Sequence, residues 1–415
     1  MVQNSKTMEK GADSMQQAAE ADTTVDVMAA RPLHRIMVRL NKPADWSDGR
    51  SALSMIALAG LAAVVWWLAA AMAAAALLAG GLLLLFFVGD LLILLSLPHL
   101  RISYGSWKPQ FFQLAVLRTA AAVGVGLGAF FAAWPFILLI FAVIQLLGTA
   151  FLIWGAIVEP GQVQITRLEI RSDRLKAGVS PIRLLHISDL HIERWSRREE
   201  QILRAIAVEK PELIVITGDY VSLSNNRDAE AYRQIHHFLA QLSAPFGVYA
   251  TLGTPTVDLR EHVVPLFADL GIELLRGEQR TVNLGEERII CLLGMDCTHH
   301  IVPDAAVLEE LVQQCPADQP QILLYHSPEL MPQASDEGID LYLCGHTHGG
   351  QVRLPVIGPL LTSSQLGRRY VMGLYQRGRT HLYVSRGVGL EGLSAPRVRF
   401  LAPPEITLLT LKAAE

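Results

Sequence analysis

The sequence has 415 residues, of which 51% are hydrophobic and 18% are charged, with a formal net charge of −4 and an isoelectric point near 6.4. It is long for one domain and too apolar for an ordinary soluble protein. Its charge argues against a nucleic-acid partner, because nucleic-acid-binding proteins usually carry a basic face. The hydrophobic excess lies in the first 160 residues, which points to a membrane.

Residues 1–50 are predicted to be a disordered and then basic amphipathic segment in the cytoplasm. Residues 1 to about 29 are polar and lack sustained apolar periodicity. After them, apolar residues recur at helical spacing and arginines recur every fourth residue: Leu33, Ile36, Met37 and Leu40, with Arg31, Arg35 and Arg39. This helix could lie on an anionic membrane surface or could be a solvated, partly frayed segment.

Residues 51–158 are predicted to form four transmembrane helices. From Ala52 to Leu97 the only formally charged residue is Asp90, and from Phe111 to Val158 the only one is Arg118. Each stretch is more than twice the length of about 20 apolar residues that one span requires. We therefore place spans near 53–73, 77–97, 112–133 and 136–157.

The distribution of basic residues predicts the orientation of these spans. The connection between the first and second spans and that between the third and fourth carry no basic residue. Basic residues instead precede the first span (Arg31, Arg35, Arg39, Lys42 and Arg50), lie between the second and third (Arg101 and Lys108), and follow the fourth (Arg167, Arg171, Arg174 and Lys176). Both ends and residues 159–415 should therefore face the cytoplasm. The expected location is a bacterial inner membrane.

Three features within the spans allow more than one interpretation. Asp90 and Arg118 could line an ion path, could pair with each other, or Arg118 could extend to the interface. Gly124 and Gly128 form a G-x-x-x-G pattern that would permit a homodimer through the transmembrane helices.

Beyond Glu159-Pro160-Gly161, strand-like apolar runs alternate with helical stretches such as 199–208 and 229–242. Four of the runs are followed at the same end by metal-binding residue types: Asp189 and His191, Asp219, His326, and His346 and His348. The carboxyl ends of strands are where open α/β sheets place their sites. The pattern therefore predicts a metal site.

The order D-x-H, G-D, H and G-H-x-H resembles that of the calcineurin-like metallophosphoesterase family. The resemblance covers roughly residues 160–415, and residues 383–387 and 402–406 are similar to its membrane-associated branch. It implies an α/β fold with a double-sheet sandwich flanked by helices, preceded here by a four-helix transmembrane region.

The same resemblance implies two divalent metal ions. Asp219 would bridge them, Asp189, His191 and His348 would complete one site, and His326 and His346 would belong to the other. Such a pair activates a bridging hydroxide and neutralises charge on the phosphoryl oxygens. Mixed His and Asp ligation suits Mn, Fe or Zn better than Ca.

One motif departs from the family. After the apolar run 247–252 the family usually has Gly-Asn-His-Asp or Glu, whereas this chain has Gly253-Thr254-Pro255-Thr256. Thr254 is a weaker ligand than Asn, which would weaken the second metal site, and Pro255 has no titratable group. Loss of a general acid typically costs on the order of 10² to 10⁴ in rate, so no catalytic residue is assigned beyond the ligands. Arg386 could bind phosphate or form a structural salt bridge.

Three functions are compatible with these patterns. The first is a membrane-anchored, metal-dependent phosphoesterase that cleaves a phosphodiester, either lipid-linked or a soluble nucleotide. The second is a catalytically impaired relative that acts as a membrane sensor or scaffold. The third is a transporter or channel regulated by its soluble domain.

The cysteines, which lack C-x-x-C spacing, are expected to be small buried hydrophobes in a reducing compartment: Cys291, Cys297, Cys315 and Cys344.

Overall fold

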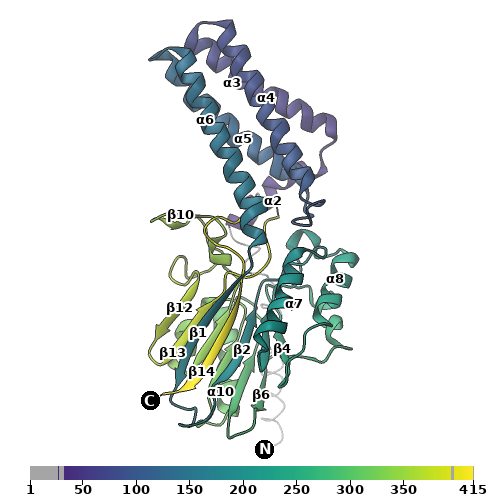
Figure 1. The fold of residues 1–415 in the computed structure, drawn as a ribbon, viewed down its shortest axis with the longest axis vertical. Helices are drawn as coiled ribbons and strands as arrows, with labels where there is room; N and C mark the ends of the chain where they lie inside the picture. The colour runs from purple at the N-terminus through teal and green to yellow at the C-terminus, as the bar shows by residue number, and fades with distance from the viewer. Residues whose placement is uncertain (1–26, 28–31, 394–396, 415) are drawn as a thin grey trace, which may run out of the picture.

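The computed structural model describes residue 27, residues 32–393 and residues 397–414. A bundle of apolar helices stands on one end of an α/β unit, so that the molecule is elongated (Figure 1). The expected basic helix is α2 (Pro32–Leu40), which lies where the bundle meets the α/β unit. The predicted disordered segment, residue 27 apart, lies outside the described residues.

The described residues contain four helices that are long and apolar enough to cross a membrane. They are α3 (Asp48–Ala70), α4 (Ala73–Ser96), α5 (Trp107–Gly126) and α6 (Trp134–Ile153). Short helical turns accompany them: η1 (Lys42–Asp45), η2 (Leu127–Phe130), η3 (Trp154–Val158) and η4 (Glu159–Gly161). The four helices match the predicted spans but begin a few residues earlier. The early start of α3 is explained by the Ser47 side chain, which accepts a hydrogen bond from Arg50 N and caps the helix.

A buried ion pair links two helices of the bundle. Arg118 on α5 donates from Nε and Nη2 to the two carboxylate oxygens of Asp90 on α4, at 2.5 and 2.6 Å. Its Nη1 donates to Gln145 Oε1 on α6 at 2.8 Å. Of the interpretations considered for these charges, the structure shows the mutual pairing.

The G-x-x-x-G pattern lies on α5 and η2. A Cβ at Gly128 would contact Ile137 of the same chain at 3.3 Å, whereas Gly124 has open space around it. The homodimer stays a prediction.

Buried polar contacts fix the bundle to the α/β unit. Glu159 accepts hydrogen bonds from the backbone nitrogens of Leu401 and Ala402, at 3.1 and 2.7 Å. Glu193 accepts a hydrogen bond from Tyr104 N at 2.6 Å and forms an ion pair with the buried Arg397. The bundle end that carries Tyr104 therefore lies against the residues around Glu193. The α4–α5 connection and the chain leaving α6 therefore both meet the α/β unit at the same end of the bundle.

Two mixed six-stranded sheets form the α/β unit. The first has the order β1 (Gln164–Ser172), β14 (Glu405–Ala413), β2 (Ile182–Ile187), β3 (Leu213–Thr217), β4 (Val248–Thr251), β5 (Ile272–Leu274). The second has the order β12 (Gly373–Arg377), β13 (Thr380–Val384), β9 (Leu341–Cys344), β8 (Gln321–Leu324), β7 (Ile289–Gly294), β6 (Glu278–Asn283). The expected double-sheet sandwich is therefore present.

The core of the sandwich follows from the alternation of side chains along each strand. Leu184 of β2 packs between the sheets with Leu292 and Leu343, whereas its neighbour Leu185 packs outward with Ile235 of α8. Burial on both faces explains why the central strands are continuous apolar runs. The covering helices are α7 (Arg197–Glu209) and α8 (Ala229–Leu239) on the first sheet, and α10 (Ile301–Gln314) and α11 (Met331–Asp336) on the second.

Shorter elements connect the strands near the bundle and at the loops. They are α9 (Arg260–Val263), η5 (Leu223–Asn225), η6 (Val264–Phe267), η7 (Pro328–Leu330), η8 (His348–Gly350), β10 (Arg353–Leu354) and β11 (Gly358–Pro359). The β10–β11 hairpin projects beside the base of the bundle (Figure 1).

A disulfide joins Cys291 of β7 to Cys315 after α10, with Cα atoms 6.1 Å apart. The expectation that all four cysteines are reduced is therefore wrong for these two. The sequence does not indicate this pairing, because it is the packing of α10 on β7 that brings the two cysteines together. Cys297 and Cys344 are free and buried, as expected.

Candidate metal centre

The six predicted ligands lie in loops that follow parallel strands. β2 and β3 are parallel in the first sheet, and β8 and β9 are parallel in the second. Asp189 and His191 follow β2, Asp219 follows β3, His326 follows β8, and His346 and His348 follow β9. Because these strand ends meet at one edge of the sandwich, all six side chains come together, and all six are buried.

The backbone at these residues is unusual. Five of the six have φ in the left-handed region, which costs about 1–3 kcal/mol for a residue other than glycine and is concentrated at functional sites. They are Asp189 (51°), His191 (43°), Asp219 (56°), His346 (70°) and His348 (51°). Hydrogen bonds across the strand ends hold this conformation, among them Asp189 N to Gly218 O at 3.0 Å and His346 N to Asp189 Oδ1 at 3.0 Å.

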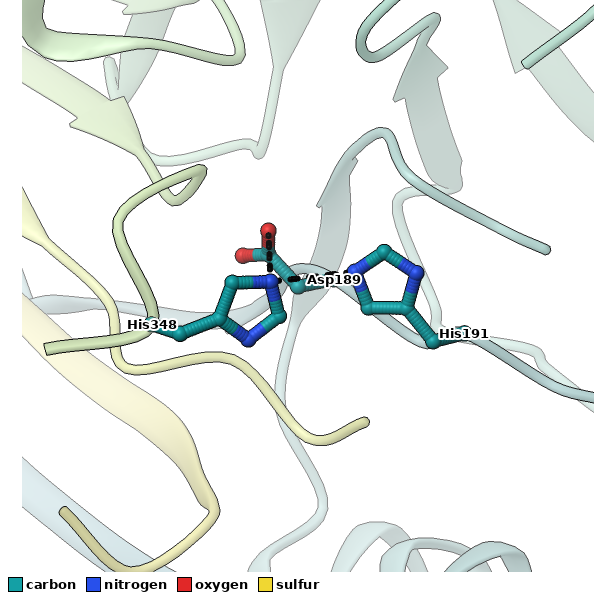
Figure 2. Close-up of side chains that lie close together, drawn as sticks. All are labelled: Asp189, His191 and His348. Atoms are coloured by element: carbon teal, nitrogen blue, oxygen red, sulfur yellow. Dashed lines mark hydrogen bonds and ion pairs between the residues drawn. The ribbon is translucent and has the colours of Figure 1, made fainter. Parts of the chain in front are cut away.

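The first group of ligands is Asp189, His191 and His348. His191 Nε2 lies 3.0 Å from His348 Nε2, and His348 Nε2 lies 3.4 Å from Asp189 Oδ1. Figure 2 shows the two imidazole rings pointing toward each other beside the carboxylate. His191 Nδ1 lies 2.9 Å from Val221 O and 3.1 Å from Glu391 Oε2, which directs Nε2 toward the group. Two imidazole nitrogens and a carboxylate oxygen at these separations fit a divalent transition metal.

The second group is Asp219, His326 and His346. His326 Nε2 lies 3.2 Å from Asp219 Oδ2, and its Nδ1 is held 2.6 Å from Thr217 O. The Nε2 atom of His346 is buried and has no hydrogen-bond partner among the described residues. Buried polar atoms are rarely unsatisfied, so this nitrogen fits a second cation. Asp219 Oδ2 also lies 3.7 Å from His191 Nε2, which places this carboxylate between the groups.

The charges of the centre shift the pKa values of its histidines. Burial lowers the pKa of His326, but the Asp219 and Asp189 carboxylates outweigh it and raise the pKa to about 10. Burial opposes protonation of His191 as well, yet Glu391 and Asp219 raise its pKa to about 9. Burial lowers the pKa of His346 to about 3, with the neighbouring His299 adding to the effect. In the absence of cations, His326 and His191 are therefore protonated at neutral pH beside the Asp219 carboxylate.

The departure from the family motif lies directly beside the second group. Thr254 N donates to Asp219 Oδ1 at 2.7 Å, and Thr254 Oγ1 lies 3.4 Å from His346 Nδ1. A Cβ at Gly253 would lie 2.2 Å from Asp219 Oδ1, so only glycine fits there. The loop after β4 thus reaches the centre, but at Pro255 it brings no group that could transfer a proton.

The two arginines near the centre differ in how far the sequence revealed them. Arg386 Nη2 donates to Glu405 Oε2 at 2.5 Å and to Gln164 Oε1 at 3.2 Å, which matches the salt-bridge alternative; phosphate binding by Arg386 stays a prediction. Arg399 is fully buried, and its Nη2 lies 3.3 Å from His348 Nδ1. No motif surrounds Arg399, so nothing in the sequence could have revealed it.

Other residues at the centre were also missed. Asp258 accepts hydrogen bonds from the backbone nitrogens of Asp219, Tyr220 and Gly253 at 2.8, 2.9 and 2.8 Å, and so fixes the ends of β3 and β4. His299 follows β7 and its ring centroid lies 4.7 Å from that of His346. The signal that revealed the other ligands, a histidine after a strand, was present at His299 as well.

A cavity of about 790 Å³ extends from the second ligand group to the helical bundle. Asp219, Thr254, His346 and His348 lie at one end of it. The remaining lining is mostly apolar and comes largely from α2, α5, α6 and the residues after β11: Ile36, Leu40, Leu114, Leu117, Ile144, Phe151, Leu152, Leu360 and Leu361. Arg118 and Gln145 of the bundle also line it. The metal centre and the bundle therefore share one cavity.

Comparison with known proteins agrees with the geometry. The family model described as calcineurin-like phosphoesterase matches residues 182–350. The metallophosphoesterase YkuE of Bacillus subtilis is 32% identical over 263 residues, which are 62% of this chain and 88% of YkuE. This chain belongs to the calcineurin-like phosphoesterase family. The family fold implies divalent metal ions; which ions they are, and the ligand role of each residue, stay predictions.

Two further relatives of this chain carry functional names. Phosphodiesterase YaeI of Escherichia coli is 30% identical over 260 residues, 61% of this chain and 90% of YaeI. The UDP-2,3-diacylglucosamine pyrophosphatase LpxG of Chlamydia muridarum is 24% identical over 316 residues, 62% of this chain and 92% of LpxG. With its four long apolar helices, this member of the family is a membrane protein.

Proposed function

We propose that this protein is a membrane-anchored, metal-dependent phosphodiesterase whose substrate carries a lipid-like tail. The observation that carries this proposal is the cavity that begins at the ligand groups and continues between α2, α5 and α6. A phosphoryl group at the centre would leave an attached apolar tail in contact with Leu114, Ile144 and Phe151. We further propose that the centre faces the cytoplasm of a bacterial inner membrane, from the distribution of basic residues.

The protein's own groups would orient the reaction. Two divalent cations at this centre would polarise phosphoryl oxygens and supply a water of lowered pKa. His191 and His326 are held by the carbonyls of Val221 and Thr217, which keep their Nε2 atoms directed into the centre. Asp219 lies between the two groups and is itself fixed through Asp258.

The motif departure bears on the leaving group. Since Pro255 cannot donate a proton, a substrate whose leaving group is weakly basic is favoured over one that releases an alkoxide. A phosphate leaving group, as in a phosphoanhydride, meets this condition. The name of LpxG describes a pyrophosphatase that acts on an acylated nucleotide sugar, which is a substrate of this type.

The base of the bundle offers a route from the bilayer to the centre. Leu360 and Leu361 follow the β10–β11 hairpin, are exposed, and line the same cavity as the helices. On α5, Leu117 is also exposed and lines it. Exposed apolar residues around a cavity next to transmembrane helices fit the entry of an acyl chain.

The first test measures hydrolysis by the full-length protein in detergent with Mn²⁺. An activated diester, bis(p-nitrophenyl) phosphate, and an acylated nucleotide diphosphate substrate would be compared, with Asp219→Asn as the control variant. We expect turnover of both by the wild-type protein and none by Asp219→Asn. No turnover with two bound metal ions would instead support the second function, a sensor or scaffold, which the Thr254 and Pro255 departure favours.

The second test addresses the lipid tail. Ile144→Trp would fill part of the cavity, whereas Leu147→Trp places the same bulk on an exposed position of α6 outside the lining. A loss of about 1–3 kcal/mol from overpacking corresponds to a roughly 5- to 150-fold loss of affinity. We expect Ile144→Trp to lower kcat/KM for the acylated substrate by roughly that factor while sparing the soluble diester. Equal effects of both variants, or equal effects on both substrates, would contradict a tail in the cavity.

A further inference from the structure

A third group of potential ligands adjoins the two already described. His299, Glu329 and His346 each offer one ligand atom, and these atoms lie within 4.8 Å of one another. All three residues are buried. His346 is also a member of the second group, so His299 and Glu329 lie directly next to the position proposed for the second cation.

The backbone relates His299 to the other ligands. His299 follows β7, which is parallel to β8, so it lies at the strand edge from which His326 also comes. Its φ is 62°, in the same left-handed region as five of the six predicted ligands. Such strain persists only where the surrounding structure imposes it and is concentrated at functional sites.

The side-chain atoms of this group are not satisfied by one another. Glu329 Oε2 and His346 Nε2 are buried and have no hydrogen-bond partner among the described residues. Glu329 Oε2 lies 3.8 Å from His299 Nδ1, which is too far for a hydrogen bond. The carboxylate is nevertheless oriented, because Glu329 Oε1 accepts a hydrogen bond from Gln365 N at 2.7 Å.

The group lies on the side where the family motif is missing. His299 Nε2 is 3.5 Å from Thr254 Oγ1, and His346 Nδ1 is 3.4 Å from the same oxygen. The hydroxyl that stands at the asparagine position is therefore flanked by two imidazoles. Thr254 has no amide oxygen, so the second cation would lack the ligand that Asn supplies in the family. His299 and Glu329 are the neighbouring residues that could supply a ligand atom to it.

We propose that His299 and Glu329 are ligands of the second divalent cation, together with His346, in place of the amide that Thr254 lacks. With Asp219 and His326, the donors around the second cation would be three imidazoles and two carboxylates, a set that suits a borderline cation such as Mn²⁺, Fe²⁺ or Zn²⁺. The inference rests on the proposed function, since it requires the same centre to hold two cations. It explains how a chain without the family motif retains the second metal position.

The test measures metal binding rather than activity. Full-length protein in detergent, stripped of metal, would be dialysed against Mn²⁺ and the bound ions counted by mass spectrometry. The variants are His299→Ala and Glu329→Gln, the latter keeping the Oε1 acceptor for Gln365. His236→Ala is the matched control, because His236 lies on the surface with Asp269. Asp189→Asn serves as the variant of the first group.

We expect two ions per chain in the wild-type protein and in His236→Ala. His299→Ala and Glu329→Gln should keep one ion and bind the second on the order of 10 to 100 times more weakly. Anomalous scattering from crystals soaked in Mn²⁺ should show the second ion within ligand distance of His299 and Glu329. Two ions with unchanged affinity in both variants, or a single ion in the wild-type protein, would overturn the proposal.

The two proposals fail in different ways. A wild-type protein that hydrolyses diesters while both variants bind metal normally would overturn only the role of His299 and Glu329. A wild-type protein that hydrolyses nothing, but loses its second ion in both variants, would overturn only the phosphodiesterase. Thermal unfolding of the metal-free variants checks that they are folded. If His299→Ala unfolds, Glu329→Gln, which keeps the shape of the side chain, still tests whether this group binds the second ion.

Discussion

His191 Nε2 and His348 Nε2 lie 3.0 Å apart, although 157 positions separate the two residues in the chain. Two ring nitrogens so close together need a proton or a cation between them. His191 has a pKa raised to about 9 by Glu391 and Asp219 despite its burial, so in the metal-free protein the proton is present at neutral pH. Protons and cations therefore compete for the same nitrogens.

Metal affinity should consequently rise with pH. His191 and His326, with pKa values of about 9 and 10, are protonated at pH 7 in the metal-free protein, and binding must displace these protons. Raising the pH removes the competing protons, so the apparent Kd for Mn²⁺ should fall about tenfold for each unit of pH increase and each displaced proton between pH 6 and 9. Calorimetry in buffers of different ionisation enthalpy would count the released protons. A Kd that is independent of pH would contradict the prediction that protons and cations compete for the nitrogens of His191 and His326.

Restoring the family motif should increase the rate. The double change Thr254→Asn and Pro255→His would supply an amide ligand and a group able to transfer a proton, beside His346 and Asp219. We expect kcat for a diester with a basic leaving group to rise on the order of 10² to 10⁴. The control is Thr254→Ser, which keeps the hydroxyl and should leave kcat near the wild-type value. An inert double variant that still binds two ions would show that another feature limits the chemistry.

Removal of one partner of the buried ion pair should destabilise the bundle. Asp90→Asn would leave Arg118 buried without a counter-charge, which typically costs about 3–5 kcal/mol. Thermal unfolding in detergent should show a lower Tm. The apolar pair Asp90→Leu with Arg118→Met should regain most of the stability. If Asp90→Asn instead abolished ion flux in proteoliposomes without loss of Tm, the transporter hypothesis would be supported.

The disulfide should contribute to the stability of the isolated protein. Cys291 and Cys315 are 24 positions apart, and a cross-link of this kind typically contributes about 2–4 kcal/mol. Cys291→Ser should therefore lower the Tm of the purified protein, whereas Cys297→Ser, at a free buried cysteine, should leave the effect of reducing agents intact. Mass spectrometry of unreduced peptides would identify the bond directly. Equal unfolding of oxidised and reduced wild-type protein would contradict this contribution.

The orientation in the membrane is a separate prediction. The basic residues before α3, between α4 and α5, and after α6 predict a cytoplasmic α/β unit, whereas disulfides are typical of oxidising compartments. Fusions at the C-terminus would distinguish the two sides. We expect a fluorescent GFP fusion and an inactive alkaline phosphatase fusion. The opposite result would place the centre outside the cytoplasm and would account for the Cys291–Cys315 bond.

The sequence by itself determined the elements whose signal is local. Two long apolar stretches, each with a single charged residue, predict four spans because span length depends on the run of apolar residues. Apolar strand runs that end in Asp or His predict the six ligands, because the carboxyl ends of parallel strands meet at one edge. The fold of the α/β unit followed from the resemblance of these motifs to a family, since local patterning does not specify how two sheets pack.

Only the tertiary structure decided the features that depend on contacts between distant segments. Packing of α4 against α5 selected the Asp90–Arg118 pair from several readings. Packing of α10 on β7 joined Cys291 to Cys315, and the turn after β7 brought His299 beside His346. The cavity exists because the bundle is fixed onto the sandwich by Glu159, a contact that spans 243 positions of the chain. Side-chain periodicity reports which face of an element is buried, but not which distant element covers it.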